Sequence, residues 1–106
     1  MQEKPKSFEK YKSNSRFYYV IRFDIEFDKT IAAWKYDEVK LPYGQPTYDK
    51  IVDAMVSFKY PIDKMQAIIN NYLLDQNDVE AKNDFVEMQS WRKYSKDYAK
   101  EIMINF

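Results

Sequence analysis

The chain has 106 residues, which is room for one domain with a single hydrophobic core. Its 45% apolar and 18% aromatic content exceeds that of disordered segments, so the chain is expected to fold. Its 17 basic side chains balance its 17 acidic ones, which argues against DNA binding as a default, although residues 1–15 are slightly basic and residues 47–106 slightly acidic.

Two residue types that commonly carry chemistry are missing from the sequence. Without cysteine the chain can form neither a disulfide framework nor a thiolate metal site, and without histidine it lacks the usual zinc ligand and general base. No apolar run is long enough to cross a bilayer, and the segment Met1–Pro5 has no hydrophobic signal region. We therefore expect a cytoplasmic or virion-associated protein that is neither secreted nor membrane-bound.

Residues 16–41 predict an antiparallel β-hairpin, preceded by a polar, flexible lead-in over residues 1–15. From Phe17 the side chains alternate strictly, which is typical of a strand with one buried face. A second strand over about 31–41 alternates less regularly, and a bulge near Asp37 would reconcile its pattern. The apolar face of the first strand is expected to hold Phe17, Tyr19, Ile21, Phe23, Ile25 and Phe27.

Three helices are expected after the break at residues 42–46, which holds the only glycine. Thr47 is the expected N-cap of a helix over about 48–59, and Pro61 ends that helix by disfavouring helical geometry at Tyr60. Further helices are predicted over about 62–74 and 79–103. The predicted fold is therefore α+β, with an N-terminal antiparallel β-hairpin packed against three C-terminal helices in one domain, residues 16–106.

Candidate catalytic residues are few. Asp24, Glu26 and Asp28 alternate along the first strand about 7 Å apart, a spacing that could hold Mg²⁺ or Ca²⁺. A solvated strand face that discourages edge pairing explains them as well, and we favour that reading. No serine or threonine lies beside an activating base, and one glycine cannot build a phosphate-binding loop. We expect no enzyme activity, no catalytic residue, no cofactor and no metal site.

Aromatic residues are the remaining surplus, with ten Tyr, seven Phe and two Trp. Exposed tyrosine suits an interface because it offers a large contact area and a polar end, whereas tyrosines lying flat over a small sheet would merely complete its cover. We weigh the two readings equally. The candidate interaction residues are Tyr18, Val20, Arg22, Trp34, Tyr36, Tyr43 and Tyr60.

Several segments between residues 16 and 101 carry a resemblance. They are Arg16–Arg22, Pro46–Tyr48 leading into Ile51–Ala54, Lys59–Tyr60, Ala67–Tyr72 and Phe85–Arg92, followed by Lys96 and Ala99–Lys100. Their pattern of strand and helix boundaries resembles that of small uncharacterised proteins encoded in phage and prophage genomes near tail genes. The resemblance implies a phage-derived or virion-associated role and supplies no active-site residues.

The sequence thus favours a non-enzymatic interaction or assembly module. Its expected partner is another protein or a second copy of the chain, which would form a homodimer through strand edges. The alternative is a nucleic-acid-binding regulator that uses the helix pair 48–74 as a helix-turn-helix. Its second helix offers Lys64, Gln66, Asn70 and Asn71 to base edges but too few positive charges for phosphate contacts.

Overall fold

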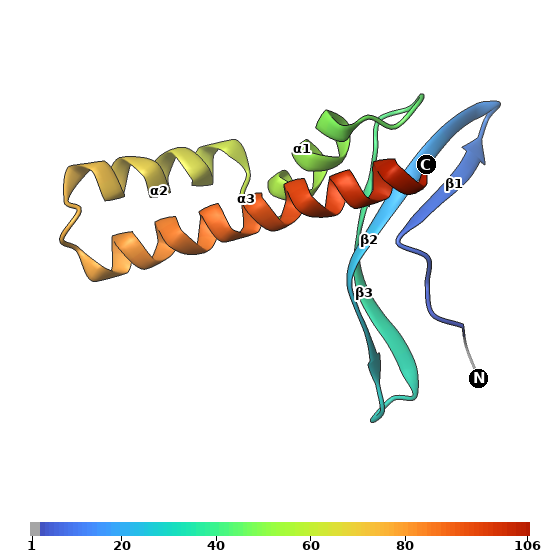
Figure 1. Cartoon of the computed structure of the whole chain (residues 1–106), viewed down its shortest axis with the longest axis horizontal. Helices are drawn as coiled ribbons and strands as arrows, with labels where there is room; N and C mark the ends of the chain where they lie inside the picture. The colour runs from blue at the N-terminus through green and yellow to red at the C-terminus, as the bar shows by residue number, and fades with distance from the viewer. Residues whose placement is uncertain (1–2) are drawn as a thin grey trace.

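Three strands followed by three helices make up the computed structural model, which describes residues 3–106 (Figure 1). The strands are β1 (Phe8–Ser13), β2 (Arg16–Asp28) and β3 (Ala33–Lys40), and the helices are α1 (Tyr48–Lys59), α2 (Ile62–Leu74) and α3 (Val79–Asn105). The predicted α+β class is confirmed. Each helix begins where the sequence predicts it, and α3 ends two residues later than expected.

The N-terminal sheet has three antiparallel strands in the order β1-β2-β3, one more than the predicted hairpin. The expectation of a flexible segment over residues 1–15 is wrong for Phe8–Ser13, which pairs with β2 from Phe8 opposite Ile21 to Ser13 opposite Arg16. Asn14 and Ser15 connect these strands with positive φ angles of 51° and 67°, the geometry of a two-residue hairpin turn. The turn escaped prediction because it contains no glycine.

A β-bulge divides β2 into two halves. Its pairing with β3 shifts between Phe23 and Glu26, where Asp24 adopts a φ of 53°. One extra residue in a strand reverses its side-chain alternation. Phe27 consequently lies opposite Trp34, on the other side of the sheet from Phe23. The six apolar residues expected on one buried face are therefore split, and the bulge expected near Asp37 lies on the neighbouring strand.

The hydrophobic core lies between the first half of β2 and helices α1 and α3. Thr47 caps α1 as predicted, because its hydroxyl accepts from the Lys50 amide at 3.2 Å. Phe106, after the end of α3, packs against the same part of the sheet, with its ring 5.4 Å from that of Phe8 and 5.8 Å from that of Tyr19. The core residues are Tyr19, Ile21, Phe23, Leu41, Ile51, Met55, Trp91, Ala99 and Ile102.

Two arms project from this core. One is the distal part of the β2–β3 hairpin, and the other is α2 with the first half of α3 (Figure 1). All thirteen residues of α2 are described, and none is buried. The radius of gyration is 16.6 Å, against about 13 Å for a compact domain of this length. None of the helices in residues 3–106 is long and apolar enough to cross a membrane.

Candidate functional site

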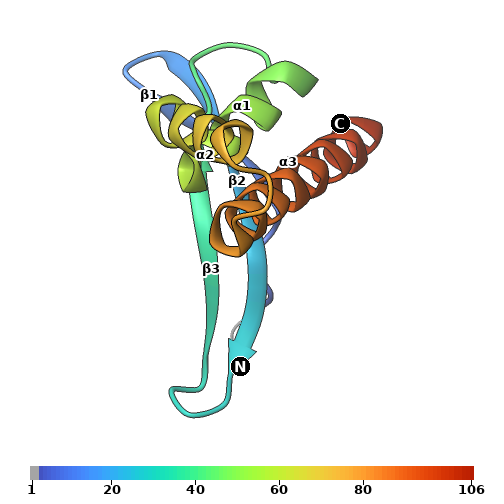
Figure 2. The same cartoon turned by 90° about the vertical axis from the view of Figure 1, so that its left-hand side faces the viewer.

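The helices lie on one side of the sheet and leave its other side, the open face, without a helix from residues 3–106 (Figure 2). Strand register decides which side chains share this face, because paired residues of neighbouring strands point to the same side. The open face therefore comprises Glu9 and Tyr11 of β1, Tyr18, Val20, Arg22 and Phe27 of β2, and Trp34, Tyr36, Glu38 and Lys40 of β3.

The structure brings six of the seven predicted interaction residues together. Tyr18, Val20, Arg22, Trp34 and Tyr36 lie on the open face by register, and Tyr43 packs against its edge with its ring 6.0 Å from that of Tyr18. Tyr60 lies elsewhere, because it follows the last turn of α1 at the junction with α2. Burial and the nearby Glu87 and Asp84 carboxylates raise the pKa of Tyr60.

Arg22 occupies the centre of the open face and is 7% exposed. Its guanidinium donates to Glu38 Oε2 at 2.7 Å, to Glu9 Oε1 at 2.8 Å and to the Tyr11 hydroxyl at 2.7 Å. A fourth hydrogen bond reaches the Lys6 carbonyl at 3.2 Å. One buried cation thus joins all three strands to the segment that precedes β1, and its charge is fully satisfied within the chain.

The protonation of this network follows from its hydrogen bonds. The Arg22 guanidinium, with help from the Tyr11 hydroxyl, holds the pKa of Glu9 below its usual 4.5. Burial alone would lower the pKa of Arg22, but its hydrogen bonds to Glu9, Glu38 and Tyr11 outweigh that effect and raise it. These shifts stabilise the charged forms of both Arg22 and Glu9.

Aromatic side chains flank the network on both sides. Toward the β1–β2 turn, the rings of Tyr11 and Tyr18 stack with centroids 5.6 Å apart. Toward the hairpin tip, Phe27 and Trp34 contact each other at 5.3 Å, and Tyr36 lies 5.4 Å from the Arg22 guanidinium. Tyr36 and Phe27 are 43% and 42% exposed, so this part of the sheet presents apolar surface to solvent.

The carboxylates considered for a cation site are separated by the bulge. Asp28 pairs with Lys35 at 3.1 Å, and Asp24 lies 3.7 Å from the Lys59 ammonium. Lys35 and the Thr30 amide lower the pKa of Asp28. No group of three or more potential metal-ligating side chains occurs within residues 3–106. Asp24 and Asp28 therefore form surface ion pairs with lysines.

Sequence reasoning missed half of the open face. The sequence predicts a flexible segment where Glu9 and Tyr11 lie, and its pattern does not distinguish Glu38 or Lys40 from other surface residues. The available signal was the alternation around Phe8 and Tyr11, which is short and carries few apolar residues. Comparisons with protein-family models, curated proteins and solved structures give no match for this chain.

Proposed function

We propose that the protein is a non-enzymatic interaction module whose open face packs against a second copy of itself. The observation that carries this proposal is a sheet covered by helices on one side only, with exposed aromatic side chains on the other. An antiparallel sheet can leave its second face in water, but Tyr36 and Phe27 make this face apolar, and face-to-face packing of two sheets is a common way to bury such a face. The role in phage assembly implied by the sequence resemblance is compatible with such a module.

The accessible surface area of the chain is large enough to include an interface with a second copy. The chain exposes 7661 Å², whereas a compact monomer of its mass exposes roughly 6,300 Å². The difference exceeds the roughly 800 Å² that each partner contributes to a standard protein interface. Each chain could therefore bury about 800 Å² in a dimer and still expose at least as much surface as a compact monomer of its mass.

Charge on the open face favours self-association over repulsion. By register, Arg16, Arg22 and Lys40 share this side of the sheet with the carboxylates of Glu9 and Glu38, so the face carries charges of both signs. Arg22 is already paired with two carboxylates, so burying the network leaves no unpaired cation at its centre. Edge pairing, the arrangement expected from the sequence, is disfavoured by the exposed lysines Lys10 and Lys12 on β1 and Lys35 on β3.

Sedimentation velocity over a concentration series tests the proposal. The parent chain is expected to shift from monomer to dimer within about 1–100 µM, and Tyr36→Ser to weaken the dimer by at least about tenfold. The matched control is Tyr94→Ser, because Tyr94 is 39% exposed against 43% for Tyr36 but lies on α3, away from the open face. A parent chain that stays monomeric throughout, or equal losses in both variants, would contradict the proposal.

The helix-turn-helix alternative gains no support from the packing. In such a motif the second helix is held by the first, but here both α1 and α2 pack mainly against α3. Apolar residues, among them Ile62 and Leu73, share the exposed surface of α2 with its few polar groups. We therefore do not place nucleic acid on this helix pair.

A further inference from the structure

Positive charge is concentrated at the end of the sheet that holds the β1–β2 turn. Residues 10–18 and 39–48 meet there and contain four basic side chains and no acidic one. Backbone hydrogen bonds join the two segments, from the Leu41 amide to the Tyr19 carbonyl at 2.8 Å and from the Gly44 amide to the Phe17 carbonyl at 3.2 Å. We call this end of the sheet the basic end, formed by Lys10, Lys12, Arg16 and Lys40 with the rings of Phe17 and Tyr43. By register, Lys10, Lys12 and Phe17 lie on the helix side of the sheet, and Arg16 and Lys40 lie on the open face.

The four cations of the basic end have no carboxylate partner among residues 3–106. Within residues 3–106 only Arg22, Lys35, Lys59 and Lys93 form ion pairs, so the basic end is distinguished by the closeness of its cations and by the lack of acidic residues in its two segments. The overall balance of 17 basic and 17 acidic side chains therefore conceals a local excess of positive charge. Neighbouring unpaired cations repel one another and create a positive potential that attracts a polyanion. Binding of the polyanion reduces this repulsion.

Two aromatic rings hold these cations in place. Lys10 and Lys12 lie over the Phe17 ring at 4.2 and 5.7 Å, and Arg16 and Lys40 lie over the Tyr43 ring at 4.3 and 4.8 Å. Such cation–π contacts position the long side chains before any ligand arrives. Phe17 and Tyr43 remain 46% and 40% exposed, so part of each ring is available to a flat group.

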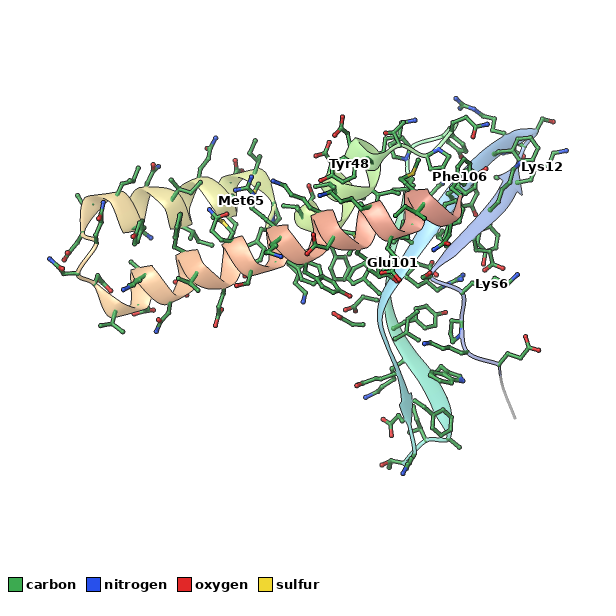
Figure 3. The ribbon with its side chains drawn as sticks, viewed as in Figure 1. Lys6, Lys12, Tyr48, Met65, Glu101 and Phe106 are labelled. Atoms are coloured by element: carbon green, nitrogen blue, oxygen red, sulfur yellow. The ribbon has the colours of Figure 1, made fainter. Side chains whose placement is uncertain are left out.

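A hollow of about 380 Å³ lies between these rings, and Lys10 and Arg16 also line it. Its volume falls within the range of roughly 300–1,000 Å³ that is usual for ligand sites. Figure 3 shows Lys12 at the tip of the sheet, beyond Phe106 at the end of the chain. The basic end thus joins an open hollow with aromatic walls to a group of cations.

We propose that the basic end binds single-stranded nucleic acid, with phosphates paired to Lys10, Lys12, Arg16 and Lys40 and bases stacked against Phe17 and Tyr43. Grooves that combine backbone-tracking cations with aromatic stacking are how proteins bind single strands without sequence preference. A duplex keeps its bases stacked inside, and an acidic peptide offers nothing to the rings. The proposal goes beyond self-association of the open face and does not require it. Lys40 belongs to both surfaces, so self-association should compete with nucleic acid for this residue.

Fluorescence anisotropy with labelled dT and rU oligonucleotides of about twelve nucleotides tests the proposal, and the two strands distinguish DNA from RNA as the source. At about 50 mM salt we expect a dissociation constant of roughly 10 µM, rising about 50-fold at 200 mM salt because four phosphates are neutralised. Lys12→Gln with Arg16→Gln should weaken binding at least about tenfold and halve the salt dependence.

Three controls separate this site from general polyanion binding. Lys82→Gln with Lys96→Gln removes the same charge from exposed positions on α3 and should leave binding unchanged. Phe17→Leu should cost about fivefold or more through lost stacking, and Phe17→Tyr should restore it. A duplex of equal length and a polyglutamate peptide of equal charge should bind more weakly than either single strand.

Three results would overturn all or part of the proposal. No anisotropy change up to about 100 µM protein at low salt, where even non-specific binding is measurable, overturns the proposal. Tighter binding of the duplex or of polyglutamate than of the single strands would also overturn the proposal, because the surface would then suit a different partner. Unaltered affinity in Phe17→Leu, in a variant whose circular dichroism matches that of the parent, would overturn the stacking half.

Discussion

The indole N–H of Trp91 on α3 donates to the backbone carbonyl of Met55 on α1 at 2.9 Å, and both residues are buried. The same indole ring lies 5.5 Å from Phe23 of β2. Trp91 therefore joins both core helices to the sheet. Because Met55 and Trp91 are 36 residues apart in the chain, this side chain makes a long-range contact between the two helices.

Trp91→Phe is expected to lower the free energy of unfolding by about 2 kcal/mol, through a lost hydrogen bond and a smaller ring in a packed site. Urea unfolding followed by far-UV circular dichroism measures the change. Trp34→Phe is the matched control, because it makes the same substitution in the β2–β3 arm outside the core. Equal losses in the two variants would show that the core does not depend on Trp91.

Acid is expected to destabilise the sheet through Glu9, whose pKa in the folded protein lies below its usual 4.5. A depressed carboxyl pKa contributes stability that is fully present above the unfolded value and is lost as the pH falls through the folded value. The melting temperature should therefore fall below about pH 4.5. Glu9→Gln should melt lower than the parent at neutral pH and lose less on acidification. Asp53→Asn, an exposed change on α1, should follow the parent profile.

Asp24 occupies the left-handed region with a φ of 53°, where glycine is less strained than other residues and β-branched residues are disfavoured. Asp24→Gly is expected to leave stability unchanged or raise it by up to about 1 kcal/mol, and Asp24→Val to lower it by more than about 1 kcal/mol. Chemical denaturation of both variants checks the order. Glu26→Val, two residues along the strand, should change stability by less than about 0.5 kcal/mol. A destabilised Asp24→Gly would contradict this account of the bulge.

The bulge also explains why the prediction of one buried face on β2 was wrong. Strict alternation from Phe17 to Phe27 predicted one buried face, because periodicity reports a strand but not an extra residue within it. Helix boundaries were predictable to within two residues because Thr47 and Pro61 mark ends through local geometry. Strand β1 was missed because its pairing depends on β2 and its turn lacks glycine.

Half of the residues of the open face could be predicted, because the pattern of one strand does not show which strands pair with it. The alternate positions Tyr18, Val20 and Arg22 follow from β2 alone. Their partners Glu9 and Tyr11 depend on the register of a strand that only tertiary pairing specifies. Burial of Arg22 was likewise invisible in the sequence, because a charged residue becomes buried only where its counter-ions converge from other strands.

The stacked rings of Tyr72 and Phe85, with centroids 4.3 Å apart and planes 7° apart, hold α2 against α3. No residue of α2 is buried, so this helix should open locally without unfolding the core. Phe85→Ala is expected to speed hydrogen exchange of the α2 amides about tenfold and to leave β2 amides near Ile21 unchanged. Val86→Ala removes the neighbouring, 52% exposed side chain and should change neither. Faster exchange in β2 as well would mean that the helical arm and the core unfold as one cooperative unit.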